Sequence, residues 1–505
     1  MNDSIKVSKE DSLTSSGWNF DNSYTRLAKT FFVKQKPTPV KAPQIVLFNQ
    51  ALAISLGLKA ETLLGDEACA IFSGNKLPLG AEPIAQAYAG HQFGHLNMLG
   101  DGRAVLLGEH ITPEGNRYDI QLKGAGVTAY SRRGDGRAAL GPMLREYIIS
   151  EAIHALGIPT TRSLAVVSTG ELVYREGALP GAILTRIAAS HIRVGTFQFA
   201  VSNDDPELVK SLADYTLDRH FPNLVNDENK YLSLLNVVID NQAKLIAQWM
   251  QVGFIHGVMN TDNMSICGES IDFGPCAFLD NYDPATVFSS IDQQGRYAFG
   301  NQPPIAQWNL TRFAETLLPL IHHDIEESIR IAETALKAFA DKYQHNWLTG
   351  MRAKLGLLAE EPDDLELVEE LLNSMKKYRM DYTNTFRDLT SNLTSGSISN
   401  SSLNMEEYSD RPDFVTWHHR WINKLSRQTE SIEIAKTLML KTNPVVIPRN
   451  HQVEAALSAT ETGDFTVVEK LLAVLSQPYI EDASNISYRS PSLPSAVPYK
   501  TFCGT

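Results

Sequence analysis

Two carboxylates and an amide stand close together in HGVMNTDNMSICGESIDFGPCAF, residues 256–278. Asp262 directly precedes Asn263, and Asp272 follows Asn263 by nine positions. Adjacent like charges repel unless a positive charge lies between them. A short hairpin would bring the Asn263 amide oxygen and the Asp272 carboxylate onto one hard cation, and Mg²⁺ prefers such oxygen ligands. The segment therefore predicts a divalent-cation site, with turn-forming Asx residues as the alternative.

Protein kinases hold metal on the phosphates of ATP with the same residue types, a catalytic-loop Asn and the Asp of Asp-Phe-Gly. This chain departs from the kinase pattern, because it has His256-Gly257 in place of His-Arg-Asp and its acid immediately precedes the Asn. Asp262 is therefore the candidate general base, able to accept the proton of an incoming hydroxyl. The alternative is an acid that lies on the surface or only supports the metal ligands.

Two motifs upstream offer groups that bind phosphate. In LGDGRAVLLGEH, Gly100 and Gly102 permit close backbone approach and Arg103 adds charge, although Gly-Asp-Gly is more often a simple turn. Lys123 ends the strand-like YDIQLKG. A strand Lys paired with a helix Glu fixes phosphates in kinases, and Glu146, in a predicted helix, is the natural partner. A solvated edge charge is the alternative for Lys123.

An arginine-rich loop, SRRGDGRAALG, places Arg132, Arg133 and Arg137 around Asp135 and Gly136. In a chain of net charge −13 this cluster suggests phosphate recognition, because guanidinium groups match phosphate geometry. A solvated basic loop is the alternative.

A second pair of arginines lies in TRIAASHIRVG, where Arg186 and Arg193 are seven positions apart. In a helix both guanidinium groups would converge on one anion, whereas in a strand they would lie on opposite faces. The spacing does not decide between the two. His91 and His95, in AGHQFGH, have the spacing of metal ligands on a helix, but Gly90 and Gly94 disfavour a helix, and a loop or packing role is expected.

Short strands and one helix are predicted to position these groups between residues 104 and 188. The strand-like runs are AVLLGEH, YDIQLKG, SLAVVST, ELVYRE and AILTRIA, and Ser168-Thr169-Gly170 predicts a hairpin turn. In YDIQLKG, alternation puts Lys123 on the face opposite Ile120 and Leu122. The helix is GPMLREYIISEAIHALG, in which Pro142 suits the first turn and Gly157 the end.

The chain becomes helical after about residue 205. YLSLLNVVIDNQAKLIAQWMQVG and DIEESIRIAETALKAFADKYQHNW are amphipathic at helical period. An acidic stretch, AEEPDDLELVEELL, and a Ser/Asn-rich stretch, SNLTSGSISNSSLN, then separate a C-terminal region. The Ser/Asn-rich stretch is predicted to be a mobile loop.

Composition narrows the class of protein. The chain has 505 residues, 43% hydrophobic and 20% charged, which is typical of a globular protein. A net charge of −13 argues against a broad electrostatic grip on nucleic acid. No apolar run approaches the roughly 20 residues that span a bilayer, and the first residues resemble no signal peptide. The four cysteines, Cys69, Cys267, Cys276 and Cys503, form no Cys-x-x-Cys pair. We therefore expect a cytoplasmic protein without nucleic-acid or membrane partners.

Together these motifs resemble the selenoprotein O family, also called YdiU, of kinase-fold protein adenylyltransferases. The resemblance is close from about Pro83 to Pro319, in YAGHQFG, LGDGRAVLLGE, YDIQLKGAGVTAYSRRGDGRAALGPMLREYI, HGVMNTDNMSI and IDFGPC, and extends to WNFDNSYTRL and a Cys near the end. It implies an α+β, protein-kinase-like bilobal fold. The implied parts are an N-terminal extension (1–80), a mixed N-lobe (81–204), a helical C-lobe with the catalytic and metal-binding loops (205–350), and a helical C-terminal region with a redox-active tail (351–505).

The resemblance also implies an activity. AMP would pass from ATP, bound in a flipped orientation relative to kinases, to Ser, Thr or Tyr hydroxyls of protein substrates, with Mg²⁺ or Mn²⁺ as the metal. The alternatives are a kinase that transfers the γ-phosphoryl group, a non-catalytic ATP-binding scaffold, and transfer of UMP from UTP. The missing His-Arg-Asp motif speaks against the kinase, and the intact polar residues speak against the scaffold.

Individual roles follow from the resemblance. Asp262 would be the base, Asn263 and Asp272 would bind metal, and Glu146 would pair with Lys123. The nucleotide would be held by Gly100, Gly102, Arg103, Lys123, Asp135, Gly136, Arg186, Arg193 and Asp272. Some family members pair a cysteine near the C-terminus with one after Asp-Phe-Gly, and Cys503 and Cys276 occupy these places. The resemblance thus implies a reversible, redox-sensing disulfide, with two unrelated thiols as the alternative.

Overall fold

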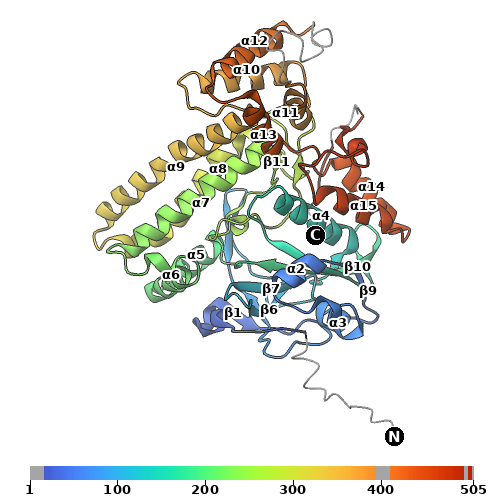
Figure 1. Ribbon diagram of the computed structural model, residues 1–505. Coiled ribbons are helices and arrows are strands. Elements are labelled where there is room, and N and C mark those ends of the chain that lie inside the picture. The colour runs from blue at the N-terminus through green and yellow to red at the C-terminus, as the bar shows by residue number, and fades with distance from the viewer. Residues whose placement is uncertain (1–15, 394–409, 494–498, 503–505) are drawn as a thin grey trace.

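The computed structural model describes residues 16–393, 410–493 and 499–502. Within them the fold is mixed α+β, with an antiparallel sheet in the first part of the chain and helices in the second (Figure 1). The main sheet has eight strands in the order β1-β3-β6-β7-β10-β9-β2, with β8 paired to β10. These strands are β1 (Phe32–Lys34), β2 (Gln44–Phe48), β3 (Ile84–Gln86), β6 (Ala104–Ile111), β7 (Arg117–Lys123), β8 (Ala138–Ala139), β9 (Arg162–Tyr174) and β10 (Ala178–Ala188).

Two strands from the first 80 residues complete this sheet at its edges. β1 pairs with β3 at one edge, and β2 pairs with β9 at the other. The short helices α2 (Gln50–Ser55) and α3 (Asp66–Phe72) pack an apolar cluster against the sheet, and Ile120 and Leu122 of β7 belong to it. Lys123, on the opposite face of β7, makes polar contacts instead. The predicted alternation along β7 is therefore confirmed.

The predicted hairpin turn at Ser168-Thr169-Gly170 is wrong. β9 continues through these residues and pairs with β10 on both sides of them. The register shifts there, so that residues 169–171 of β9 lie opposite Gly181 alone. Gly170 has φ 68°, which lets the strand bulge without reversing its direction. The turn-forming residues thus mark a bulge within one long strand.

The predicted helix between the strands is confirmed as α4 (Leu140–Ala155). Its residues are apolar on nearly every side, and most are buried. One side contacts β9 and β10, and another contacts α14 (Asn450–Glu461) and α15 (Thr466–Leu475), which lie beside α4 in Figure 1. A helix that is apolar all round must be covered on several sides. The C-terminal helices therefore complete the packing of the sheet region.

Long helices dominate the second half. The two predicted amphipathic helices are confirmed as α7 (Lys230–Val252) and α9 (Ile325–Lys354), which pack together with α8 (Gln302–Ile321). The remaining helices are α5 (Val194–Val201), α6 (Pro206–His220), α10 (Asp364–Lys377), α11 (Tyr382–Ser391), α12 (Pro412–Arg427) and α13 (Ile432–Thr442). The acidic stretch enters α10, and most of the Ser/Asn-rich stretch lies outside the described residues. Across the described ranges, none of the helices combines the length and the apolarity needed to cross a bilayer.

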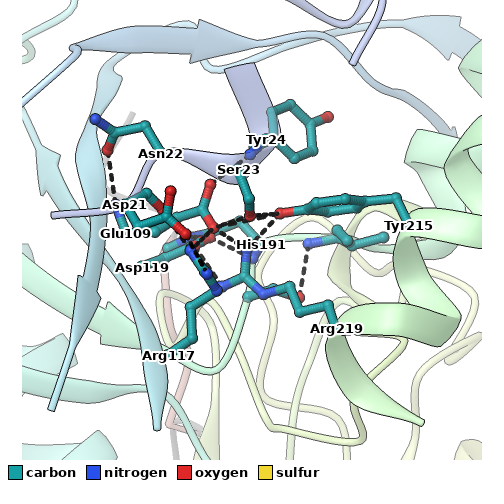
Figure 2. A network of polar contacts seen from close by, with 12 residues as sticks. Asp21, Asn22, Ser23, Tyr24, Glu109, Arg117, Asp119, His191, Tyr215 and Arg219 are labelled. Carbon is teal, nitrogen blue, oxygen red and sulfur yellow. Dashed lines mark hydrogen bonds and ion pairs between the residues drawn. The ribbon is translucent and has the colours of Figure 1, made fainter. Parts of the chain in front are cut away.

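A buried polar network joins residues 21–24, the sheet and α6 (Figure 2). Arg219 of α6 lies 2.7 Å from Asp119 Oδ1 and 3.2 Å from Glu109 Oε2. Glu109 accepts a hydrogen bond from the Tyr24 amide at 2.6 Å. Asp119 also accepts from the His191 amide at 2.9 Å and from its Nδ1 at 2.8 Å. The network fixes the chain between β10 and α5.

Candidate active site

A cavity of about 710 Å³ lies where the sheet meets the loops of residues 256–278. Both glycine-rich loops, the end of β7 and the start of α5 contribute to its lining. The lining includes the predicted residues Gly100, Gly102, Arg103, Lys123, Asp135, Gly136, Arg186, Arg193, Asp262, Asn263 and Asp272. Side chains separated by more than 170 positions in the chain thus face one space.

A cluster of charges, buried except for the partly exposed Asp272, forms one wall of the cavity. Lys123 Nζ lies 2.5 Å from Glu146 Oε2 and also donates to Asp272 Oδ1. Arg186 Nη1 lies 3.3 Å from Glu146 Oε1, so that Glu146 joins the two cations from its place in α4. Burial acts to raise the pKa of Asp272, but Lys123 and Arg186 outweigh it and hold that pKa well below its usual value. The Asp272 carboxyl group is therefore ionised at neutral pH.

A small hairpin brings the two ends of the 256–278 segment together. β11 (Phe254–Ile255) pairs with β12 (Ala277–Phe278), and the residues between them form the loops that face the cavity. Asp272 has φ 68°, a left-handed conformation that Asp tolerates better than most residues. Such strained positions cluster at functional sites.

Asn263 and Asp272 both line the cavity and suit a hard cation. Asn263 Nδ2 donates to the Val258 carbonyl at 3.0 Å, which fixes the amide and leaves its oxygen available as a ligand. Among the described residues, no group of three or more His, Cys, Asp or Glu side chains has a metal-binding arrangement. A cation at Asn263 and Asp272 would therefore take its other ligands from phosphate oxygens and water, as Mg²⁺ commonly does.

Asp262 lies at the edge of the cavity and is only 9% exposed. Its Oδ1 accepts no hydrogen bond from the part of the chain that the structure describes. Burial raises the pKa of Asp262 to about 6, although the Arg193 guanidinium opposes the shift. A carboxylate with this pKa can take a proton near neutral pH.

The structure decides how the two arginines of TRIAASHIRVG converge. Arg186 lies on β10, which ends at Ala188, and Arg193 is the N-cap residue of α5. Neither a helix nor a strand covers both, and the turn between them brings both side chains to the cavity. The Arg193 guanidinium stacks over the Tyr88 ring at 4.2 Å, and its Nη1 donates to the Asp262 carbonyl at 3.2 Å. The His191–Asp119 contacts described above hold this turn in place.

Gly100 and Gly136 lie in close contact with neighbouring groups, and Asp135 forms an ion pair. Gly136 has φ 64°, and a Cβ there would lie 2.1 Å from the Gly126 carbonyl oxygen. A Cβ at Gly100 would meet the Tyr130 ring at 2.4 Å. Asp135 forms a bidentate pair with Arg175, at 2.9 and 3.0 Å, which lowers its pKa. These close contacts hold the two loops against each other and make backbone part of the cavity wall.

Sequence reasoning missed several residues of the site. Tyr88 and Arg175 line the cavity, and so does the buried Asp101, which accepts from the Gln86 amide at 3.0 Å. The hairpin of β4 (Ala89–Gln92) and β5 (His95–Met98) lies apart from the main sheet and contributes Gln92. The available signal was the run YAGHQFG, in which aromatic and polar residues interrupt glycines.

The two cysteines of the expected disulfide differ in what the structure describes. Cys503 lies outside the described residues. Cys276 is buried as a free thiol and donates to the Phe273 carbonyl at 3.1 Å. Burial raises the pKa of Cys276 to about 12. The Thr501 hydroxyl donates to the Pro275 carbonyl at 2.6 Å, so the chain before Cys503 passes close to Cys276.

Comparison with known proteins gives a match to the family model "Protein adenylyltransferase SelO" over residues 15–476. This chain belongs to the SelO family. It is 61% identical over 490 residues to a protein nucleotidyltransferase YdiU of Brevibacillus brevis, covering 97% of this chain and 98% of that protein. It is 59% identical over 500 residues to the YdiU protein of Bacillus cytotoxicus, covering 99% and 100%. The YdiU protein of Syntrophotalea carbinolica is 58% identical over 497 residues, with 98% and 99% covered. Membership of the SelO family places the chain among nucleotidyltransferase enzymes.

Proposed function

We propose that this chain is a protein adenylyltransferase, which transfers AMP from ATP to Ser, Thr or Tyr hydroxyls of protein substrates. The observation that carries the proposal is the junction at Asp262, Asn263 and Asp272. There a carboxyl group of raised pKa and two oxygen-bearing side chains share one cavity with a set of cationic side chains. Transfer to a hydroxyl needs these groups in one place, because it depends on positioning and charge stabilisation.

The nucleotide would occupy the 710 Å³ cavity. Arg103, Lys123, Arg186 and Arg193 would bind its phosphates, and the glycine-rich loops at 100–102 and 134–136 would contact it through backbone. Lys123 is preorganised, because Glu146 and Asp272 already hold its ammonium group. Asp135 lies at the far loop, where Arg175 fixes its orientation. Several arginines around the phosphates would stabilise the negative charge that develops on the phosphate oxygens during transfer.

Asn263 and Asp272 would hold Mg²⁺ or Mn²⁺ against the phosphates. A bound divalent cation would neutralise charge on the phosphate oxygens and on the leaving pyrophosphate. Lys123 would share Asp272 with it, so both positive charges would face the same part of the triphosphate.

Asp262 would act as the general base. It would accept the proton of the acceptor hydroxyl while that oxygen attacks the α-phosphorus and the bond to pyrophosphate breaks. Arg193 would stabilise the charge on the phosphorus oxygens, and its hydrogen bond to the Asp262 carbonyl keeps it beside the base.

The layout of the chain fits a kinase-like arrangement with two lobes. The sheet and α4 would form the first lobe, the helices around α7 the second, and the cavity the cleft between them. The implied boundaries at residues 80, 204 and 350 would place the catalytic and metal-binding loops in the second lobe. α14 and α15 pack on α4, so the C-terminal region would also support the first lobe.

Redox control by a Cys276–Cys503 disulfide is part of the proposal. Support comes from the hydrogen bond between the Thr501 hydroxyl and the carbonyl of Pro275, the residue that precedes Cys276. Closing the bond would remove two electrons and two protons from the two thiols and pass them to a small-molecule disulfide, which is reduced to two thiols. Because burial disfavours the Cys276 thiolate, Cys503 would react first with that oxidant, and the Cys276 sulfur would then displace the small thiol. Labelling with and without reductant, and in Cys503→Ser, tests this control.

Parallel labelling with α-³²P-ATP and γ-³²P-ATP tests the function. The proposal expects label from the α-position, on the enzyme or on added proteins, and its loss in Asp262→Asn and Asp272→Asn and after addition of EDTA. Asp283→Asn, which changes an acid about half exposed and outside the cavity, is the matched control. Label from the γ-position would identify a kinase, and ATP binding with no label would identify a scaffold. A parallel reaction with α-³²P-UTP separates AMP from UMP transfer.

A further inference from the structure

A second, smaller cavity adjoins the first at the candidate base. Its volume is about 270 Å³, and the residues that line both cavities are Gln92, Arg103, Asp262, Asn263 and Asp272. The residues that line only the smaller one are Phe93, Val258, Asn260, Gly274, Pro275 and Ile291. A group in the smaller cavity would therefore reach Asp262 from a space outside the nucleotide cavity.

The two cavities differ in chemistry. The larger one is lined by six arginines, of which the smaller one shares Arg103 alone. Phe93, Val258, Pro275 and Ile291 give the smaller one apolar walls. Ile291 is 53% exposed and lies at its rim. Apolar walls around a polar floor fit a side chain with an apolar body and a polar tip.

Phe93 occupies a turn position that favours other residues. It and Gly94 join β4 to β5, where Gln92 pairs with His95. Both turn residues have positive φ, 51° for Phe93 and 87° for Gly94. Such two-residue turns favour Asn, Asp or Gly at the first position, and a bulky residue there is strained. Strain of this kind persists where the surrounding structure and function require it.

The turn is tied to the loop that carries Asp262. The Phe93 amide donates to Asn260 Oδ1 at 3.2 Å, and the His91 amide donates to Thr261 Oγ1 at 2.7 Å. The Phe93 ring packs edge-on against Tyr297, with ring centres 5.1 Å apart. The Tyr297 hydroxyl in turn donates to Asn260 Oδ1 at 2.6 Å. Backbone and ring of Phe93 are thus both fixed relative to the base.

We propose that the smaller cavity receives a tyrosine side chain of the protein substrate and that Phe93 is a specificity-determining residue. This inference rests on the adenylyltransferase function proposed above. The phenolic oxygen bonds to the α-phosphorus of ATP, the bond from that phosphorus to the bridging oxygen breaks, and pyrophosphate leaves with the electron pair. The phenolic proton passes to the Asp262 carboxylate.

Two physical reasons favour tyrosine over serine or threonine. An aromatic ring covers the apolar walls and packs against Phe93, whereas a short aliphatic side chain leaves them in contact with water. A phenol, with an ordinary pKa of about 10, also gives up its proton to a carboxylate more readily than an aliphatic alcohol. Both effects act on kcat/KM for the acceptor.

Acceptor peptides with identical flanks and a central Tyr, Ser or Thr test the inference with α-³²P-ATP. We expect the wild-type enzyme to favour Tyr by about tenfold or more in kcat/KM, since about 1.4 kcal/mol of aromatic packing is tenfold. The Phe93→Asn substitution puts a residue that this type of turn favours at its first position, so the melting temperature should equal that of the wild type. The Tyr preference of this variant should fall to about threefold or less, with little change for Ser and Thr. Ile291→Ala should lower the Tyr rate as well.

Leu96→Ala is the matched control, because Leu96 lies on the same hairpin, is 48% exposed and lines neither cavity. It should leave the Tyr preference unchanged. Equal wild-type rates for Tyr, Ser and Thr would overturn the inference alone, and so would a full Tyr preference in folded Phe93→Asn. Absence of α-label from every acceptor and from the enzyme would overturn the adenylyltransferase function, and this inference with it.

Discussion

Replacing Arg219 with methionine should destabilise the protein by about 3 to 5 kcal/mol at pH 7, the usual cost of breaking a buried ion pair from one side. Arg219 is 3% exposed, and its partners Asp119 and Glu109 are each 1% exposed, so water does not screen the loss (Figure 2). Glu109 keeps Arg117 at 2.9 Å and the Tyr24 amide. Asp119 keeps only His191 among the groups described above, and burial lowers the pKa of His191 to about 4, so that its ring is neutral at pH 7.

The loss should depend on pH in a definite direction. In the wild type, burial acts to raise the pKa of Asp119, but Arg219 and His191 outweigh it and hold that pKa well below its unfolded value of about 3.9. The carboxylate therefore contributes stability above about pH 4, which is lost as the pH falls further. Without Arg219 the burial effect prevails and protonation becomes favourable. The difference between wild type and variant should thus be largest at pH 7 and shrink toward pH 4.

Urea denaturation at pH 7 and pH 4, followed by circular dichroism, measures both quantities. Lys210→Met is the matched control, because Lys210 lies on the same helix and forms a partly exposed i,i+4 pair with Asp214, 3.4 Å apart. That substitution should cost no more than about 0.5 kcal/mol. A loss below about 1 kcal/mol for Arg219→Met at pH 7, or an equal loss at both pH values, would refute the reasoning.

Three further predictions concern single groups. In thermal melts, Asp262→Asn should stabilise the protein by about 2 kcal/mol at pH 7 and should have no effect at pH 4. The reason is that burial raises the pKa of Asp262 in the folded protein to about 6, so the stability of the wild type falls as the pH rises from about 4 to 6. Lys354→Met should stabilise the protein by about 2 to 4 kcal/mol at pH 6 and by less at pH 9 in the same melts. Burial lowers the pKa of Lys354 to about 7, so the stability of the wild type rises between about pH 7 and 10. Gly90→Ala should lower labelling about 100-fold or more while ATP still binds, because its Cβ would lie 2.2 Å from Asp262 Oδ1; Gly177→Ala, with no atom within 4 Å, should have no effect.

Helix and strand existence was predictable where periodicity is strong. α7 and α9 follow apolar residues at helical spacing, and α4 lies between Pro142 in its first turn and Gly157 just past its end. β6 and β10 follow compact apolar runs, and β7 follows apolar residues at alternate positions. The hairpin at 168–170 was wrong, because turn-forming residues also suit a bulge, and only the pairing partner distinguishes them. A local pattern carries no information about what lies opposite.

The residues proposed to hold phosphate and metal could also be predicted from the sequence, because several of them lie close together in the chain. Asp262, Asn263 and Asp272 stand within one short segment, and β11 and β12 close it into a hairpin. Lys123 and Glu146 come from a strand and the helix that follows, which is a short-range relation.

By itself, then, the sequence determined the chemical groups of the site, the periodic elements and the family. Only the tertiary structure decided how the groups converge. It brought Arg186 and Arg193 to one cavity by ending β10 between them, and it docked the 89–98 hairpin on the loop of Asp262, more than 160 positions away. The physical reason is that long-range contacts depend on packing and on the burial of paired charges, which no local spacing encodes.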